Sequence, residues 1–171
     1  AGRLEPGVCY RLWTEEAQRG LLQFTPPEIL DADLAPLALE LAAWGVADAD
    51  GLPWLTPPPT VSLATARTLL ADLGAIDEAG AITPHGRAMA RLGQHPRLAH
   101  LVLKGRELGQ GKVAALLVAI LGERDFLRLP PGQRDVDLRH RVDIALSGKA
   151  PRQVLEAARR LTQGKDSDSS V

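Results

Sequence analysis

Residues 73–90 of the sequence, LGAIDEAGAITPHGRAMA, contain the pattern that decides the fold. Two short segments, residues 75–77 (AID) and 81–83 (AIT), flank the turn-forming residues 78–80, and this arrangement predicts a β-hairpin. Thr83 stands directly before Pro84, which is the pattern of a helix N-cap followed by proline in the first turn. The stretch therefore predicts a small two-stranded wing that leads straight into a helix reaching about Leu92.

Two further helices are predicted before this wing. The first carries an apolar stripe and ends at Gly45, and the second runs from about residue 61 to residue 73, where Gly74 ends it. Helices followed by a small wing are typical of a winged helix, which we expect over residues 26–83. The apolar stripe and the loop between the helices also contain aromatic residues. We interpret all three tryptophans as core residues: Trp13, Trp44 and Trp54.

The sequence after the wing predicts one helix after another over residues 84–163. Residues 112–121 are apolar nearly all round, so we expect them to form the buried central helix of a bundle. The expected fold is mainly α, with a winged helix fused to a helical bundle. At the start of the chain, residues 8–13 alternate in polarity as a half-buried strand does. Residues 164–171 are polar, and we expect a disordered tail there.

Composition and charge limit the class of protein. Alanine and leucine number 54 of the 171 residues against 15 for valine and isoleucine, which favours helix over sheet. The longest apolar run, residues 113–121, is too short to span a bilayer, and a single cysteine fits a reducing compartment. We therefore expect a cytoplasmic protein without a membrane partner.

Basic residues concentrate in the second half of the chain. Residues 1–59 have a net charge of −6, whereas residues 85–141 contain 11 basic and 5 acidic side chains. Within that segment, Arg97, His100 and Lys104 share one face of a predicted helix, and three arginines surround a polar loop and the helix after it: Arg134, Arg139 and Arg141. Basic side chains clustered on one surface can bind an anionic polymer.

The segments that resemble enzyme motifs lack residues that those motifs require. The segment 109–112, GQGK, resembles a phosphate-binding loop, but Val113 stands where serine or threonine should bind Mg²⁺, and no strand precedes it. The histidines and the cysteine lack the spacing of a zinc site. The sequence therefore predicts no metal site and no catalysis by this chain on its own.

The sequence does resemble a known family. Residues 1–12, AGRLEPGVCYRL, resemble the end of motif VI of the DEAH/DExH-box helicases and the strand that follows it. Later segments are similar, in order and spacing, to the bacterial HrpB-type ATP-dependent helicases. These segments are residues 27–30 (PEIL), 33–34 (DL), 39–41 (LEL), 44–45 (WG), 54–58 (WLTPP), 73–75 (LGA), 83–90 (TPHGRAMA) and 95–99 (HPRLA).

The resemblance implies a role for each part of the chain. Residues 1–25 would be the tail of the second RecA-like motor domain, residues 26–83 the winged helix, and residues 84–163 the helical ratchet, or helicase-associated, domain. The chain would be a fragment of an ATP-dependent RNA helicase whose ATP-hydrolysing motor domains lie upstream. ATP and Mg²⁺ would then be cofactors of the parent protein, with none in this fragment, and the parent's RecA-like domains would be partners.

The resemblance also implies two kinds of site. Arg3 matches the last arginine of motif VI, which acts as an arginine finger on ATP in intact relatives. The ratchet would contact single-stranded RNA, or DNA, through its cations: Arg97, His100, Lys104, Arg134, Arg139 and Arg141. An alternative is a free-standing winged-helix DNA-binding transcription regulator. In such a regulator the second helix enters the major groove of DNA. The predicted second helix, residues 61–73, argues against that alternative, because Arg67 is its one cation.

Overall fold

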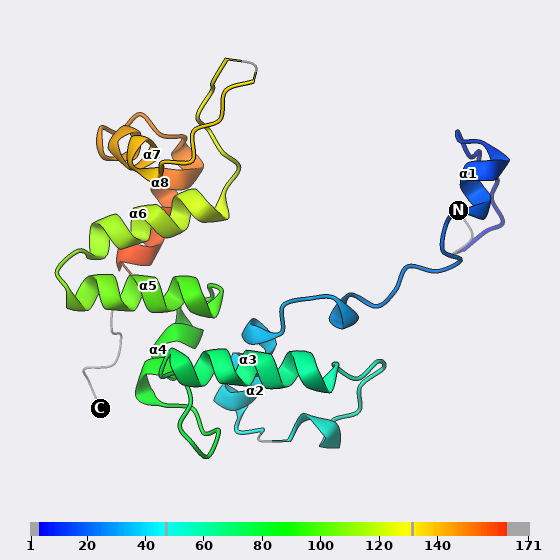
Figure 1. Cartoon of the computed structure of the whole chain (residues 1–171), viewed down its shortest axis with the longest axis horizontal. Helices are drawn as coiled ribbons and strands as arrows, with labels where there is room; N and C mark the ends of the chain where they lie inside the picture. The colour runs from blue at the N-terminus through cyan, green and yellow to red at the C-terminus, as the bar shows by residue number, and fades with distance from the viewer. Residues whose placement is uncertain (1–3, 47, 131, 164–171) are drawn as a thin grey trace.

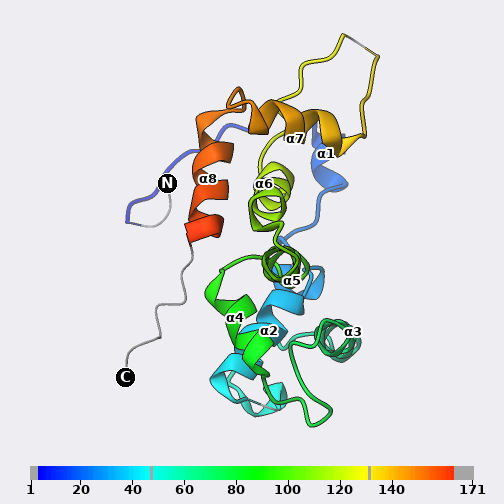
Figure 2. The ribbon, with the colours of Figure 1, turned by 90° about the vertical axis from the view of Figure 1, so that its left-hand side faces the viewer.

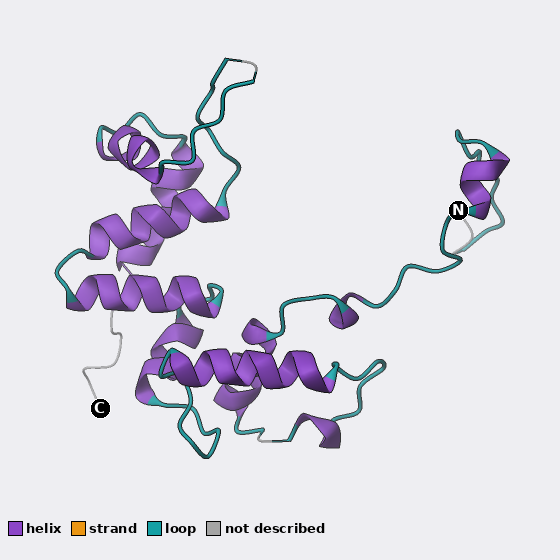
Figure 3. Cartoon of the chain, viewed as in Figure 1, coloured by secondary structure: helices purple, strands orange, loops and turns teal. Residues whose placement is uncertain are grey.

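A computed structural model of the chain describes residues 4–46, 48–130 and 132–163 (Figure 1). These residues form α-helices joined by loops and short 3₁₀ turns, and Figure 3 shows no strand among them. The prediction of a mainly α fold is therefore confirmed. The predictions for Arg3 and for the tail 164–171 lie outside the described residues. The α-helices are α1 (Glu15–Arg19), α2 (Ala35–Trp44), α3 (Thr60–Asp72), α4 (Pro84–Arg91), α5 (Pro96–Glu107), α6 (Gly111–Gly122), α7 (Leu138–Leu146) and α8 (Arg152–Gln163).

The wing is smaller than the sequence predicts. Ile76 and Ile82 form a single antiparallel bridge, so the chain reverses there without two regular strands. The physical reason lies in Thr83, whose side chain accepts a hydrogen bond from the Gly86 backbone N–H at 3.0 Å and so caps α4. The second arm of the hairpin therefore ends as soon as it has passed Ile82. The prediction of a helix opened by Thr83 and Pro84 is confirmed.

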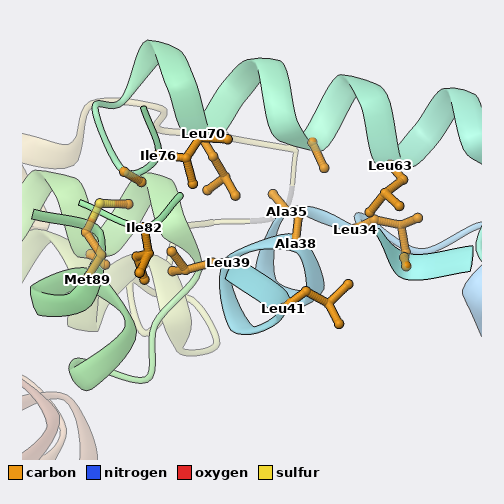
Figure 4. Close-up of a cluster of buried hydrophobic side chains, with 14 residues drawn as sticks. Leu34, Ala35, Ala38, Leu39, Leu41, Leu63, Leu70, Ile76, Ile82 and Met89 are labelled. Atoms are coloured by element: carbon orange, nitrogen blue, oxygen red, sulfur yellow. The ribbon is translucent and has the colours of Figure 1, made fainter. Parts of the chain in front are cut away.

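Helices α2, α3 and α4 enclose the core of the winged half, which we define as residues 28–92. Leu70 of α3 and Met89 of α4 are fully buried in it, beside the two bridge residues Ile76 and Ile82 (Figure 4). Gly86 lets α4 approach the wing, because a Cβ at that position would lie 2.1 Å from the Ala75 carbonyl oxygen. This contact fixes α4 on the wing and sets the direction in which the chain enters α5.

Helices α5 to α8 form the helical half, residues 96–163. Helix α6 lies at its centre, with α5 on one side and α7 and α8 on the other (Figures 1 and 2). Its residues Ala115 and Val118 pack with Val102 of α5 and Leu161 of α8. The prediction of a buried central helix is confirmed. Ala99 of α5 belongs to the core of the winged half, so α5 joins the two halves without a linker.

The N-terminal segment, residues 4–27, extends away from both halves (Figure 1). The strand predicted over residues 8–13 does not form, and Tyr10 and Leu12 are 87% and 95% exposed. A strand needs the edge of another strand to complete its backbone hydrogen bonds, and the described chain offers this segment none. Helix α1 is capped by Thr14 but has no buried residue. No helix in the described ranges is long and apolar enough to cross a membrane.

The tryptophan predictions hold for one residue of three. Trp54 is half-buried, packs against the core of the winged half and donates its indole N–H to the Ala49 carbonyl oxygen at 2.7 Å. Trp13 is 52% exposed and Trp44 is 74% exposed, so both predictions of core positions are wrong. Trp44 lies on the apolar stripe of α2, but it is the last residue of that helix, beyond the last buried position, Leu41.

Candidate nucleic-acid interface

Helix α5 presents three predicted cations on one face, and we name Arg97, His100 and Lys104 the α5 stripe. Residues three and four apart lie on the same side of a helix. The other side of α5 is buried against α6 and the winged half, through residues that include Ala99, Val102 and Gly105. Arg97 and Lys104 are exposed and His100 is half-buried. The structure therefore brings these three residues together on an accessible surface.

Two neighbours adjoin the α5 stripe. His100 Nδ1 lies 3.0 Å from Nε2 of His85 on α4, and the two rings meet edge to face. Lys104 Nζ lies 2.7 Å from the Glu107 carboxylate, in a pair exposed to solvent. The Arg97 guanidinium forms no ion pair within the described residues. Arg97 is thus available to an external anion, and the weak, exposed Lys104 pair can exchange for one.

His85 is electrostatically suited to stay neutral. Its partial burial lowers its pKa, and the neighbouring His100 and Lys104 lower it further, against a smaller opposing effect of Glu107. A neutral His85 can share one proton with His100 in the hydrogen bond between the two rings. Arg97 and Lys104 are the cations of this surface whose charge does not depend on a histidine.

A second contact, which the sequence reasoning missed, fixes the start of α5. His95 Nε2 lies 3.0 Å from the Asp33 carboxylate, across 62 positions of sequence, and His95 Nδ1 accepts a hydrogen bond from the Arg97 backbone N–H at 3.3 Å. The Asp33 carboxylate also accepts from the Ala35 backbone N–H, which is the main cause of its lowered pKa. The signal in the sequence is a polar residue close to the start of each helix: Asp33 lies two positions before α2, and His95 directly before α5.

Arg141 is not a surface cation, which corrects the prediction that it contacts nucleic acid. Its side chain is 7% exposed and binds the Asp125 carboxylate through two nitrogens, at 2.6 and 3.0 Å. It also donates to the backbone carbonyl oxygens of Asp135 and Asp137. The guanidinium therefore holds the loop between α6 and α7 through four hydrogen bonds. Asp125 is a second residue that the sequence reasoning missed.

The remaining predicted cations lie on that same loop and on α7. Arg134 is exposed in the loop, and Arg139 is exposed on α7, with its Nε 4.0 Å from the Asp137 carboxylate. Helix α6 lies between α5 and α7, as both views show (Figures 1 and 2). The structure therefore does not join Arg134 and Arg139 to the α5 stripe in one patch. In the described residues, no group of three metal-ligating side chains is placed to hold a metal ion.

Comparisons with known proteins show which proteins this chain resembles. The family described as "Helicase associated domain (HA2), winged-helix" matches residues 66–93, which run from α3 through the wing and α4. The chain is 37% identical, over its whole length, to the ATP-dependent RNA helicase HrpB of Escherichia coli, of which it covers 20%. It is 34% identical over 85% of its length to the pre-mRNA-splicing factor ATP-dependent RNA helicase prp22 of Schizosaccharomyces pombe, of which it covers 12%.

Solved structures give the same result. The crystal structure of the Escherichia coli DEAH/RHA helicase HrpB matches 89% of this chain, with a TM-score of 0.71 and 32% identity, and the chain covers 18% of that protein. The chain thus spans between 12% and 20% of the length of these relatives. The similarity includes both halves and keeps their order along the chain. Along its whole length the chain therefore resembles one segment of the DEAH/RHA helicase HrpB, and it contains a match to the winged-helix part of the helicase-associated domain.

Proposed function

We propose that this chain supplies the winged helix and the ratchet bundle of an ATP-dependent RNA helicase. The observation that carries the proposal is the 37% identity to HrpB along the entire chain, together with the matching fold. ATP and Mg²⁺ would be bound by motor domains outside this segment, and Arg3 would act there as the arginine finger. The winged half would be the structural joint between those RecA-like domains and the ratchet. The compartment we propose is the cytoplasm.

The α5 stripe is the proposed contact with single-stranded RNA. Arg97 and Lys104 would pair with successive phosphates, which requires exposed cations but no reading of bases. Arg134 and Arg139 would form a second, separate phosphate contact beyond α6. Arg141 has no part in the proposal, because Asp125 occupies its guanidinium.

The test is a titration of a fluorescently labelled single-stranded RNA of 15 nucleotides with the 171-residue chain. The unaltered chain should bind with a dissociation constant of about 10⁻⁴–10⁻⁶ M, as non-specific phosphate contacts do. The double variant Arg97→Glu with Lys104→Glu should bind at least about tenfold more weakly at low salt. Its fold should persist, because both side chains point away from the buried face of α5.

A matched control separates this contact from net charge. Arg11→Glu with Arg19→Glu changes the net charge equally in the exposed N-terminal segment and should leave RNA binding nearly unchanged. Equal weakening by both double variants would contradict a contact at α5. Arg67→Glu on α3 should matter little. If it alone abolished binding, the helix of the winged half would be the reader, and the regulator hypothesis would replace this one. A labelled DNA of the same sequence tests the preference for RNA.

The proposal also predicts that this chain alone neither binds nor hydrolyses ATP. Phosphate release by the purified chain should equal the background without protein, with or without RNA. Turnover that a substitution within this chain abolishes would contradict the assignment of catalysis to other domains.

A further inference from the structure

The last turn of α2 leaves an indole ring in solvent. Trp44 is 74% exposed, and its indole N–H has no hydrogen-bond partner within the described part of the chain. The other two indoles are used: Trp54 donates to the Ala49 carbonyl oxygen, and Trp13 donates to the Gln18 side chain at 2.8 Å. Trp44 is thus the one indole of the three whose ring and N–H are both open to a ligand.

A hollow of about 280 Å³ lies beside Trp44. The end of α2, the turn of the wing and α4 form its walls. The residues that give it its character are Trp44, Val46, Gly80, Ile82 and Arg87. Its lining is therefore about equally polar and apolar, with one aromatic wall and one guanidinium.

The charge of this hollow distinguishes it from the hollow on the other side of the wing. Arg87 is exposed and forms no ion pair in the described residues, and no acidic side chain is among the described residues lining this hollow. The other hollow, of about 390 Å³, is lined by Arg67 but also by Asp77 and Glu78. An anion is therefore favoured beside Trp44 and opposed beside Arg67.

We propose that the hollow beside Trp44 binds one nucleotide of a single-stranded nucleic acid. The base would stack on the indole ring, and the phosphate would pair with the Arg87 guanidinium. Every base has a flat face that can stack on an aromatic ring, so this contact is independent of sequence. A purely apolar protein surface would match Trp44 but would bury the Arg87 charge without a partner, which is unfavourable. A nucleotide satisfies both groups.

This inference rests on the proposed function, because it adds a base contact to the phosphate contacts of the α5 stripe. Helix α4 connects the two places. Its residue His85 lies against His100 of the α5 stripe, and Arg87, two positions later, lines the hollow beside Trp44. The two contacts differ in kind. The α5 stripe would form ion pairs with phosphates, whereas Trp44 would stack on a base.

The test compares two labelled probes, an oligouridylate of 15 nucleotides and an abasic oligomer of the same length. Trp44→Ala should weaken binding of the oligouridylate at least about fivefold, the lower end of the cost of removing a stacking partner. It should leave binding of the abasic oligomer unchanged. Trp44→Phe should recover most of the affinity. Arg87→Gln should weaken binding of both probes and reduce the dependence of affinity on salt.

Trp13→Ala is the matched control, since it removes another exposed indole and should change neither titration. Circular dichroism of each variant checks the fold. The proposal is overturned if Trp44→Ala binds both probes as the unaltered chain does, and the hollow would then be a protein contact. It is also overturned if both probes lose affinity equally in Trp44→Ala. If Arg97→Glu with Lys104→Glu binds normally while Trp44→Ala does not, the α5 contact fails and the nucleotide site stands.

Discussion

Helices α5 and α7 are similarly basic in sequence, but the structure uses their cations in opposite ways. On α5, Arg97 and Lys104 remain in solvent, and a weak exposed pair with Glu107 is the one ion pair they make in the described residues. On α7, Arg141 is buried and pairs with Asp125, which ties the segment after α6 to the start of α7. A count of cations therefore does not locate a nucleic-acid surface. What matters is whether a carboxylate elsewhere in the fold already holds them.

The largest expected effect tests the structural role of Arg141. Arg141→Met should lower Tm by about 5–10 °C, because it leaves Asp125 and two backbone carbonyl oxygens without their shared donor. RNA affinity should not change at a temperature where the variant is folded. Arg139→Met, an exposed neighbour, should leave Tm nearly unaltered. Thermal melts and an RNA titration of both variants check these expectations. If Arg141→Met lost RNA binding with an unchanged Tm, Arg141 would be an RNA contact and not a structural residue.

The next prediction asks whether the α7 side contributes to binding at all. Arg134→Gln with Arg139→Gln should weaken RNA binding about threefold and reduce the slope of log affinity against log salt by about 2. Its Tm should match that of the unaltered chain, since both side chains are exposed. Titrations at four salt concentrations measure the slope. An unchanged slope would restrict the interface to α5.

A smaller gain should come from releasing Lys104. Glu107→Gln removes the carboxylate that pairs with Lys104 and raises the net charge by one. RNA affinity should therefore increase about twofold at low salt and lose this advantage at high salt. Glu156→Gln is the matched control, because it releases Arg152 from a similar pair on α8. If both variants gained equally, overall charge would explain the effect.

The smallest effects concern two histidines whose pKa values shift in opposite directions. Burial lowers the pKa of His85, so the unfolded chain takes up its proton first and stability falls as pH drops through about 6.5. A hydrogen bond to the Asp135 carboxylate raises the pKa of His140. Its stabilisation is complete below about pH 6.5 and is lost as pH rises through its folded pKa.

Melts between pH 5 and pH 8 of His85→Gln and His140→Gln measure these contributions. His85→Gln should lose less stability than the unaltered chain on acidification. His140→Gln should lack the gain that the unaltered chain obtains on acidification. If both substitutions altered the pH dependence of stability in the same direction, the opposite pKa shifts assigned to His85 and His140 would be contradicted.

Local sequence patterns account for the helices and for their order along the chain. Thr83 and Pro84 open α4, Gly74 follows α3 with a φ of +68°, and the apolar residues of α6 require burial on all sides. These features depend on neighbours in sequence, through capping hydrogen bonds, backbone conformation and periodicity. For the same reason, the prediction that Arg97, His100 and Lys104 share one face needed only the repeat of a helix.

Contacts between segments far apart in the sequence determine which of these side chains are accessible. Arg141 is held by Asp125, 16 positions earlier, and Asp33 fixes His95, 62 positions later; neither pairing follows from helical spacing. Trp44 continues the apolar stripe of α2 but lies beyond its buried part, and the arms of the wing form a single bridge, between Ile76 and Ile82. Burial and ion pairing depend on which distant segments pack beside a residue. A local sequence pattern contains no information on those segments.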